Sequence, residues 1–122
     1  MKPEEKQADI LWSRAIKKRA GGRCELCGKE GREAHHLFKR QYKSVRWDLD
    51  NGVCLCLGCH HLAHSKPAQF AEWIINRRGK AWYDRLEQRK NVLGKPDMRE
   101  ILKNLSVSPP QNSPLWSFLG RL

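Results

Sequence analysis

The 122-residue chain contains no long apolar run. No segment approaches the roughly 20 apolar residues that a membrane helix needs, and Met1 to Lys6 lack the apolar core of a secretory signal. We therefore expect a cytoplasmic protein that does not span a membrane. A chain of this length forms one small domain, in which a bound metal would supplement a limited hydrophobic core.

Acidic side chains are also few. Asp and Glu number 13 against 24 Lys and Arg, which gives a formal net charge of +11. Such an excess of positive charge predicts a polyanionic partner, nucleic acid first. The alternative is a basic surface that binds nothing.

The five cysteines and five histidines all fall within one stretch of 41 residues, from Cys24 to His64. In a reducing cytosol, Cys-x-x-Cys pairs hold metal more often than they form disulfides. A spacer of two residues lets both sulfur atoms of a pair reach one ion, and a glycine after the second cysteine lets the backbone turn around it. The sequence therefore predicts a tetrahedral structural Zn²⁺ site, formed by Cys24, Cys27, Cys56 and Cys59. The alternative is two unrelated reduced pairs.

The 28 residues between the two pairs must loop out from such a site, so the zinc would fix the base of a functional insertion. Cys54 is the odd cysteine. It shares a predicted strand face with Cys56 and would replace it as a ligand in one interpretation. We favour the other, in which Cys54 is a buried free thiol.

Apolar spacing predicts five helices and two strands. The helices are expected at Glu4 to Ala20, as a short helix from about Cys59, and at Pro67 to Arg78, Lys80 to Lys90 and Asp97 to Leu105. The strands are expected at Ala34 to Leu37 and Val53 to Cys56. Residues 1–105 would form one domain with its core at 24–65. Residues 106–122 have the composition of a Ser/Pro-rich linker with an apolar tail, expected to pack on the domain or to dock a protein partner.

The histidine spacing fits the hydrolysis of a phosphodiester. His60 and His64 lie one helical turn apart and can chelate one ion. His35 and His36 are adjacent in a strand, so one can bind metal while a bulge or bend lets the other face a water molecule. Histidine has the pKa to deprotonate water near neutral pH, and a cation stabilises the charge that develops on the phosphate.

Each of these residues has a plainer explanation on its own. His64 would be an exposed polar residue on a helix, and Asn51 before Gly52 would be a turn former. His61 faces away from the side of His60 and His64 and is expected to have no part in the site, beyond a phosphate or surface contact. The combination at these spacings favours a nuclease site.

The pattern His35-His36, Asn51, His60, between two Cys-x-x-Cys pairs and with a Leu-Cys-x-x-Cys-His ending, resembles the HNH endonucleases of the ββα-metal (His-Me finger) class. The spacing is similar to that in the nuclease domains of DNase colicins, and the cysteine pairs are similar to those of phage and restriction-associated HNH enzymes. The resemblance covers residues 24–65, and the flanks are similar only loosely, to small phage-encoded HNH proteins. It implies an α+β fold: a ββα-metal HNH core braced by a zinc site of four cysteines, with an N-terminal helix and two to three C-terminal helices.

The resemblance also implies a role for each matched residue. His35 matches the first ligand of the catalytic ion, a place that many members fill with Asp, and His36 matches the general base. Asn51 matches the residue that holds the two arms of the motif together and orients the base. His60 matches the second ligand, and His64 matches a third ligand present in only some members.

The implied activity is hydrolysis of DNA phosphodiesters, by nicking or double-strand cutting, with 5′-phosphate and 3′-hydroxyl products. The implied catalytic ion is Mg²⁺, Mn²⁺, Zn²⁺, Ni²⁺ or Co²⁺, of which imidazole ligands disfavour Mg²⁺. The setting would be a bacterial or phage-infected cytosol, and the protein a monomer or homodimer. Two alternatives remain: a non-catalytic zinc module that binds nucleic acid or scaffolds a phage or restriction complex, and an HNH subunit that needs a partner for activity.

Double-stranded DNA is the expected partner. Basic residues cluster in the loop after the first strand and at the junction of two later helices, where they would contact phosphates without reading bases. The alternative for each cluster is a solvated helix face. Tyr42 and Trp47 interleave the loop and would either stack on DNA or enter the core. The expected phosphate contacts are Lys39, Arg40, Lys43, Arg46, Arg77 and Arg78.

Overall fold

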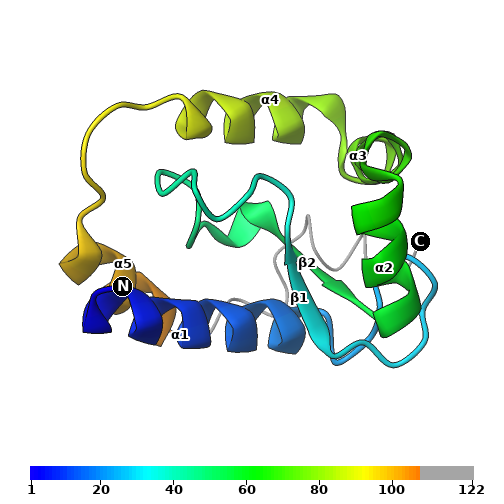
Figure 1. Cartoon of the computed structure of the whole chain (residues 1–122), viewed down its shortest axis with the longest axis horizontal. Helices are drawn as coiled ribbons and strands as arrows, with labels where there is room; N and C mark the ends of the chain where they lie inside the picture. Colours follow the sequence, from blue (N-terminus) through cyan, green and yellow to red (C-terminus); the bar gives the residue numbers. More distant parts are fainter. Residues whose placement is uncertain (108–122) are drawn as a thin grey trace.

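The computed structural model describes residues 1–107 and shows a mixed α+β architecture with one two-stranded antiparallel sheet (Figure 1). The linker and apolar tail expected over residues 106–122 lie, apart from the first two residues, outside this range. No helix in the described part is long and apolar enough to cross a membrane. The helices are α1 (Pro3–Arg19), α2 (Leu57–Ser65), α3 (Pro67–Arg78), α4 (Lys80–Lys90) and α5 (Met98–Ser106), and the strands are β1 (Glu33–His36) and β2 (Gly52–Leu55).

The observed elements agree with the expected ones to within one or two residues. The largest difference is at α2, which begins at Leu57, two residues before the expected start. The thiol of Cys56 accepts a hydrogen bond from the Cys59 amide and so caps the helix at this earlier point. At the beginning of α1, Pro3 and the acidic Glu4 and Glu5 suit the first turn of a helix, where amide groups lack partners and the helix dipole is positive.

Strands β1 and β2 pair antiparallel, with His35 opposite Val53 and His36 opposite Gly52. Helix α1 packs against both strands, and α2 also packs against both strands, on the other side of the sheet in Figure 1. The loop that joins β1 to β2 lies between α1 and α4 (Figure 1). It is held there from both sides: Arg46 bonds Asp9 of α1, and Ser44 donates to the carbonyl of Lys90 of α4.

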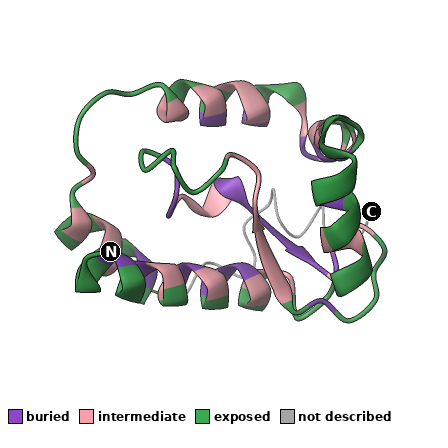
Figure 2. Ribbon diagram, in the orientation of Figure 1, coloured by how far each residue is buried: buried purple, intermediate pink, exposed green. Residues whose placement is uncertain are grey.

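Strand β2 is buried along its whole length (Figure 2). Successive side chains of a strand point to opposite faces, so β2 contributes to two hydrophobic clusters. Val53 and Leu55 belong to one cluster, with residues of α2, α3 and α4. Cys54 belongs to the other, with residues of α1 and α5. The strand is therefore the layer between the two halves of the core.

We predict that Gly52→Ala destabilises the fold, because a Cβ atom at this position would overlap the side chain of Ile16. Overpacking of this kind costs about 1–3 kcal/mol in the free energy of unfolding, which urea denaturation would measure. The matched control is Gly58→Ala in α2, where a Cβ atom would meet nothing within 4 Å. That variant should be neutral or more stable by about 0.5–1 kcal/mol. Equal stability of the two variants would contradict the packing described here.

Candidate metal centres and their surroundings

The structure brings together the four cysteines predicted to bind zinc. Their sulfur atoms all lie within 4.8 Å of one another, and those of Cys27 and Cys56 are 3.6 Å apart. Tetrahedral Zn–S bonds of about 2.3 Å place two sulfur atoms about 3.8 Å apart. The cluster is therefore compatible with a structural zinc site.

Local backbone geometry favours metal binding by these cysteines. Gly28 has a φ of +79° and its amide donates to the carbonyl of Cys24 at 2.9 Å, which turns the chain around the first pair as expected. In the second pair, the hydrogen bond from the Cys59 amide lowers the pKa of the Cys56 thiol to about 7. A thiolate is the form of cysteine that binds metal.

Cys54 is not part of this cluster. It is fully buried in the hydrophobic cluster on the α1 side, and its thiol donates to the carbonyl of Gly31 at 3.6 Å. Burial raises its pKa to about 11, so the thiol stays protonated at neutral pH. The expectation of a buried free thiol is confirmed, and the alternative in which Cys54 replaces Cys56 as a ligand is wrong.

The structure also brings together the three histidines expected to hold a catalytic ion. One nitrogen from each of His35, His60 and His64 lies within 4.8 Å of the others, and the Nε2 atoms of His60 and His64 are 3.1 Å apart. Tetrahedral Zn–N bonds of about 2.0–2.1 Å would put two such nitrogens about 3.3 Å apart. His64 is exposed, so the cluster opens to solvent. These side chains could hold a metal ion and leave room for water or substrate.

Burial, together with the neighbouring rings of His60 and His64, lowers the pKa of His35 to about 4. The ring of Phe70 lies edge-on to His35, with 5.3 Å between centroids, and forms an apolar side of the site. Burial also lowers the pKa of His60. Both imidazoles are therefore neutral at pH 7, the form that binds a metal.

Glu33 was not identified from the sequence. It lies two residues before His35, hence on the same face of β1, and its Oε2 is 3.9 Å from Nδ1 of His60. The Nε2 atom of His60 faces His64. A carboxylate near the non-ligating nitrogen of a metal-binding histidine orients the ring. The two-residue spacing from His35 was the only sequence signal.

His36 faces the other side of β1, toward α1. Its ring stacks on the indole of Trp12, with 3.8 Å between centroids and 9° between planes. Its Nε2 lies 2.9 Å from the carbonyl of Arg46. Because a carbonyl only accepts, Nε2 must carry the hydrogen, which leaves Nδ1 with its lone pair. Burial, opposed by this hydrogen bond, lowers the pKa of His36.

Asn51 is fully buried and closes the loop that follows His36. Its Nδ2 donates to the carbonyls of Phe38 and Val45, both at 3.0 Å, and its Oδ1 accepts from the Phe38 amide at 2.7 Å. Its own carbonyl accepts from the amide of Leu37. Asn51 therefore joins the two ends of the loop by hydrogen bonds.

Of the six basic residues expected at a phosphate surface, three are exposed and three are partly or fully buried. Lys39 is exposed, and Arg40 and Lys43 are exposed while paired with Asp9 and Glu5 of α1. Arg77 lies over the ring of Trp73 and donates to the carbonyl of Glu25, and Arg46 and Arg78 are buried.

The burial of Arg46 and Arg78 corrects the expectation that they lie on a phosphate-binding surface. Arg46 bonds both carboxylate oxygens of Asp9. Arg78 donates to Glu25 at 2.8 Å and to the carbonyl of Gly52 at 3.0 Å. A buried guanidinium needs such partners because its desolvation is costly. Trp47 is likewise 4% exposed, so it belongs to the core rather than to a surface that stacks on DNA.

Glu25 connects the first cysteine pair to the turn that carries Asn51. Its carboxylate accepts from Arg78 and from the amide of Cys54 at 2.7 Å. Arg78 also donates to the carbonyl of Asp50, and Arg19 donates to the carbonyls of Leu49 and Gly52. Two guanidinium groups therefore fix the carbonyls on either side of Asn51.

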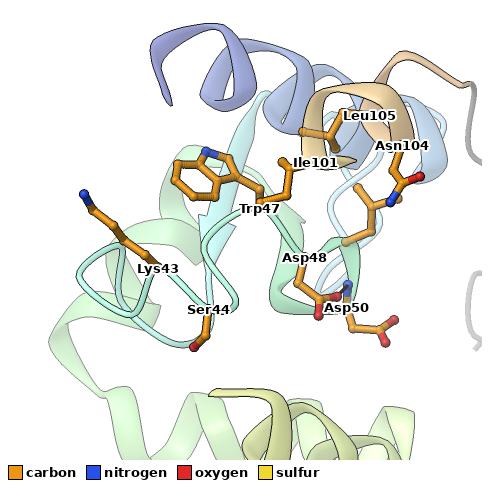
Figure 3. Close-up of a pocket in the computed structure, with 9 residues that line it drawn as sticks. Lys43, Ser44, Trp47, Asp48, Asp50, Ile101, Asn104 and Leu105 are labelled. Atoms are coloured by element: carbon orange, nitrogen blue, oxygen red, sulfur yellow. Dashed lines mark hydrogen bonds between the residues drawn. The ribbon is translucent and has the colours of Figure 1, made fainter. Parts of the chain in front are cut away.

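A surface hollow of about 450 Å³ lies between the loop and α5 (Figure 3). Asp48 and Asp50 at its edge are paired with Arg89 of α4, each at 2.7 Å. None of the residues that line this hollow belongs to either metal-ligand cluster.

No protein-family model, curated protein or solved structure matches the chain. What the two clusters do must therefore be inferred from their own residues, geometry and charge.

We predict that Cys24→Ser loses one equivalent of bound zinc and unfolds at a melting temperature lower by about 10 °C or more, because the free energy of zinc binding is also folding free energy. Metal analysis and thermal denaturation would test this. Cys54→Ala is the matched control, since Cys54 lies outside the cluster, and it should keep its zinc. A zinc-free Cys24→Ser protein as stable as the wild type would contradict the prediction.

We predict that Arg78→Met costs about 3–5 kcal/mol in the free energy of unfolding, because it leaves the carboxylate of Glu25 without its closest cation. Lys80→Met provides the comparison, because it removes an exposed pair with Asp84 and should change stability little. Urea denaturation of both variants gives the difference. Arg78→Met with wild-type stability would return Arg78 to the candidates for phosphate binding.

Proposed function

We propose that the chain is a divalent-metal-dependent endonuclease that hydrolyses DNA phosphodiester bonds with an HNH site of the ββα-metal type. The observation that supports this most is the convergence of His35, His60 and His64 from β1 and α2. The first of two antiparallel strands and the helix that follows the second strand supply these ligands. The next strand residue, His36, lies on the opposite face of β1, and its bond to the Arg46 carbonyl uses Nε2 and not Nδ1.

The donor set fits a divalent transition metal, because all three candidate ligands are imidazoles. An ion held there would supply positive charge against the scissile phosphate and its leaving oxygen. The exposure of His64 leaves one side of the cluster open. Zinc held by the cysteine cluster would have a separate, structural task, since four thiolates leave no open position on the ion.

His36 would act as the general base. Its Nδ1 takes a proton from water, and the lowered pKa keeps the imidazole neutral and able to accept that proton at pH 7. The carbonyl of Arg46 fixes which nitrogen is free, and Asn51 fixes the loop that presents this carbonyl. Attack of the water oxygen on phosphorus with loss of the 3′ oxygen gives a 5′-phosphate and a 3′-hydroxyl.

The net charge of +11 supports a polyanionic substrate. After Arg46 and Arg78 are assigned to the interior, the candidates for phosphate contact beside β1 are Lys39, Arg40 and Lys43. The last two pair with carboxylates of α1, so contact with DNA would replace or share those ion pairs. Binding of this kind weakens steeply as salt rises.

His36→Ala should lower the rate of plasmid cleavage by about 10²–10⁴-fold, because it removes the base but none of the metal ligands. The assay uses supercoiled plasmid with Mn²⁺ or Mg²⁺, and EDTA should abolish cleavage. His61→Ala is the matched control, because His61 is exposed and lies outside the histidine cluster. It should cut at the wild-type rate.

The outcomes separate the proposals. Cleavage by His36→Ala at the wild-type rate would exclude His36 as the base. Binding of DNA without cleavage by the wild type, with every divalent ion tested, would favour the non-catalytic zinc module. Cleavage that begins only after a partner protein is added would favour a subunit that needs that partner.

A further inference from the structure

We infer that Trp12 of α1 is a positioning residue for His36, so that the N-terminal helix is part of the active site rather than a flank. The inference rests on the proposed function, because it assigns Trp12 a task only if His36 is the base. It goes beyond the HNH pattern, which covers residues 24–65 and does not include α1.

The rings of Trp12 and His36 are stacked. The imidazole and indole planes are nearly parallel, at 9°, and their centroids are 3.8 Å apart. At this separation the two rings overlap face to face and touch. Rotation of His36 about its Cα–Cβ or its Cβ–Cγ bond would drive the imidazole out of the stack or into the indole, so the contact fixes the plane of the imidazole.

The indole of Trp12 is itself held in place. Trp12 is 2% exposed and belongs to the hydrophobic cluster between α1, β2 and α5. Its Nε1 donates to the carbonyl of Asp48 at 2.9 Å. The side chain of Asp48 is in turn held by Arg89 of α4. The surface against which His36 rests is therefore fixed at both its apolar and its polar end.

Two contacts together constrain the imidazole of His36. The indole sets the plane of the imidazole, and the carbonyl of Arg46 sets its rotation within that plane by accepting from Nε2. With both fixed, the lone pair of Nδ1 points in one direction. Misplacement of a reacting group by about 1 Å can cost about 100-fold in rate, so loss of the stack should be visible in catalysis.

A purely structural role predicts something different. An apolar residue of similar size could fill the core at position 12, but it would offer no flat face to the imidazole. Loss of stability alone would lower the fraction of folded protein and leave the kcat of each folded molecule unchanged. The positioning role predicts a fall in kcat itself, with KM and metal affinity retained.

The test compares Trp12→Leu with Trp82→Leu in plasmid cleavage, with the folded fraction measured for each. Trp82 is as buried as Trp12, at 1% exposed, but lies in the other hydrophobic cluster. Trp12→Leu should lose about 100-fold in kcat while its KM and its Mn²⁺ affinity, measured by calorimetry, stay near those of the wild type. Trp82→Leu should keep its kcat per folded molecule, and Trp12→Phe, which restores a flat ring, should recover most of the loss.

A second measurement is made on the wild-type protein and does not depend on whether the Trp12 variants fold. Nuclei above the face of an indole are shifted upfield, so the ring protons of His36 should resonate upfield of the other histidines in the NMR spectrum of the wild-type protein. The resonance is identified by its loss in His36→Gln. Absence of the upfield shift would overturn the inference.

The kinetic outcomes are equally decisive. If the wild type cuts DNA and Trp12→Leu cuts with the same kcat, the positioning role is wrong while the proposed nuclease activity stands. If the wild type does not cut under any condition, the proposed function itself fails, and the role of Trp12 fails with it.

Discussion

The two short strands depend on cover from both sides. An isolated two-stranded sheet of this size is at best marginally stable in water, and here each strand has only four residues. Helix α1 covers one face with Trp12 and Ile16. Helices α2, α3 and α4 cover the other with Ala63, Phe70, Ile74 and Leu86. Because β1 is half-buried and lies between these layers, its alternate side chains reach two different environments. His35 meets the other histidines on the α2 side, and His36 meets an indole on the α1 side.

Polar contacts add a second level of order to this arrangement. The sulfur cluster joins segments around residues 24–27 and 56–59, and the carboxylate of Glu25 carries that connection on to Arg78 and the turn before β2. The same turn presents Asn51, which closes the loop after β1. Metal binding by the cysteines would therefore also stabilise the loop after β1, since the groups that shape this loop are bonded to Glu25, within the first cysteine pair. Each of these contacts is short range, but together they connect the two ends of the candidate site.

Local patterns were enough to predict the helices, the strands and the two ligand clusters. Two-residue and four-residue spacings dictate the geometry of Cys24 with Cys27 and of His60 with His64 before any tertiary structure forms. The contacts that were missed are between residues far apart in the sequence. Trp12 and His36, or Glu25 and Arg78, meet only after the chain folds, and nothing in the sequence around Arg46 or Arg78 distinguishes a buried guanidinium from an exposed one. The clusters of basic residues therefore predicted a larger phosphate-binding surface than the exposed residues provide. Trp12, which stacks on His36, looked in the sequence like any apolar residue of an amphipathic helix.

One peptide bond joins the two ligand clusters: Cys59 belongs to the sulfur set, and His60, its neighbour, belongs to the nitrogen set. Should both clusters take ions, thiolates would capture a soft or borderline cation ahead of imidazoles. Filling of the sulfur set would order the first turn of α2 and thereby preset the direction of His60. Metal would then bind in order: first to the sulfur set, and then to the nitrogen set, whose residue His60 the first ion has positioned. Loss of the ion from the sulfur set would then weaken the second centre as well.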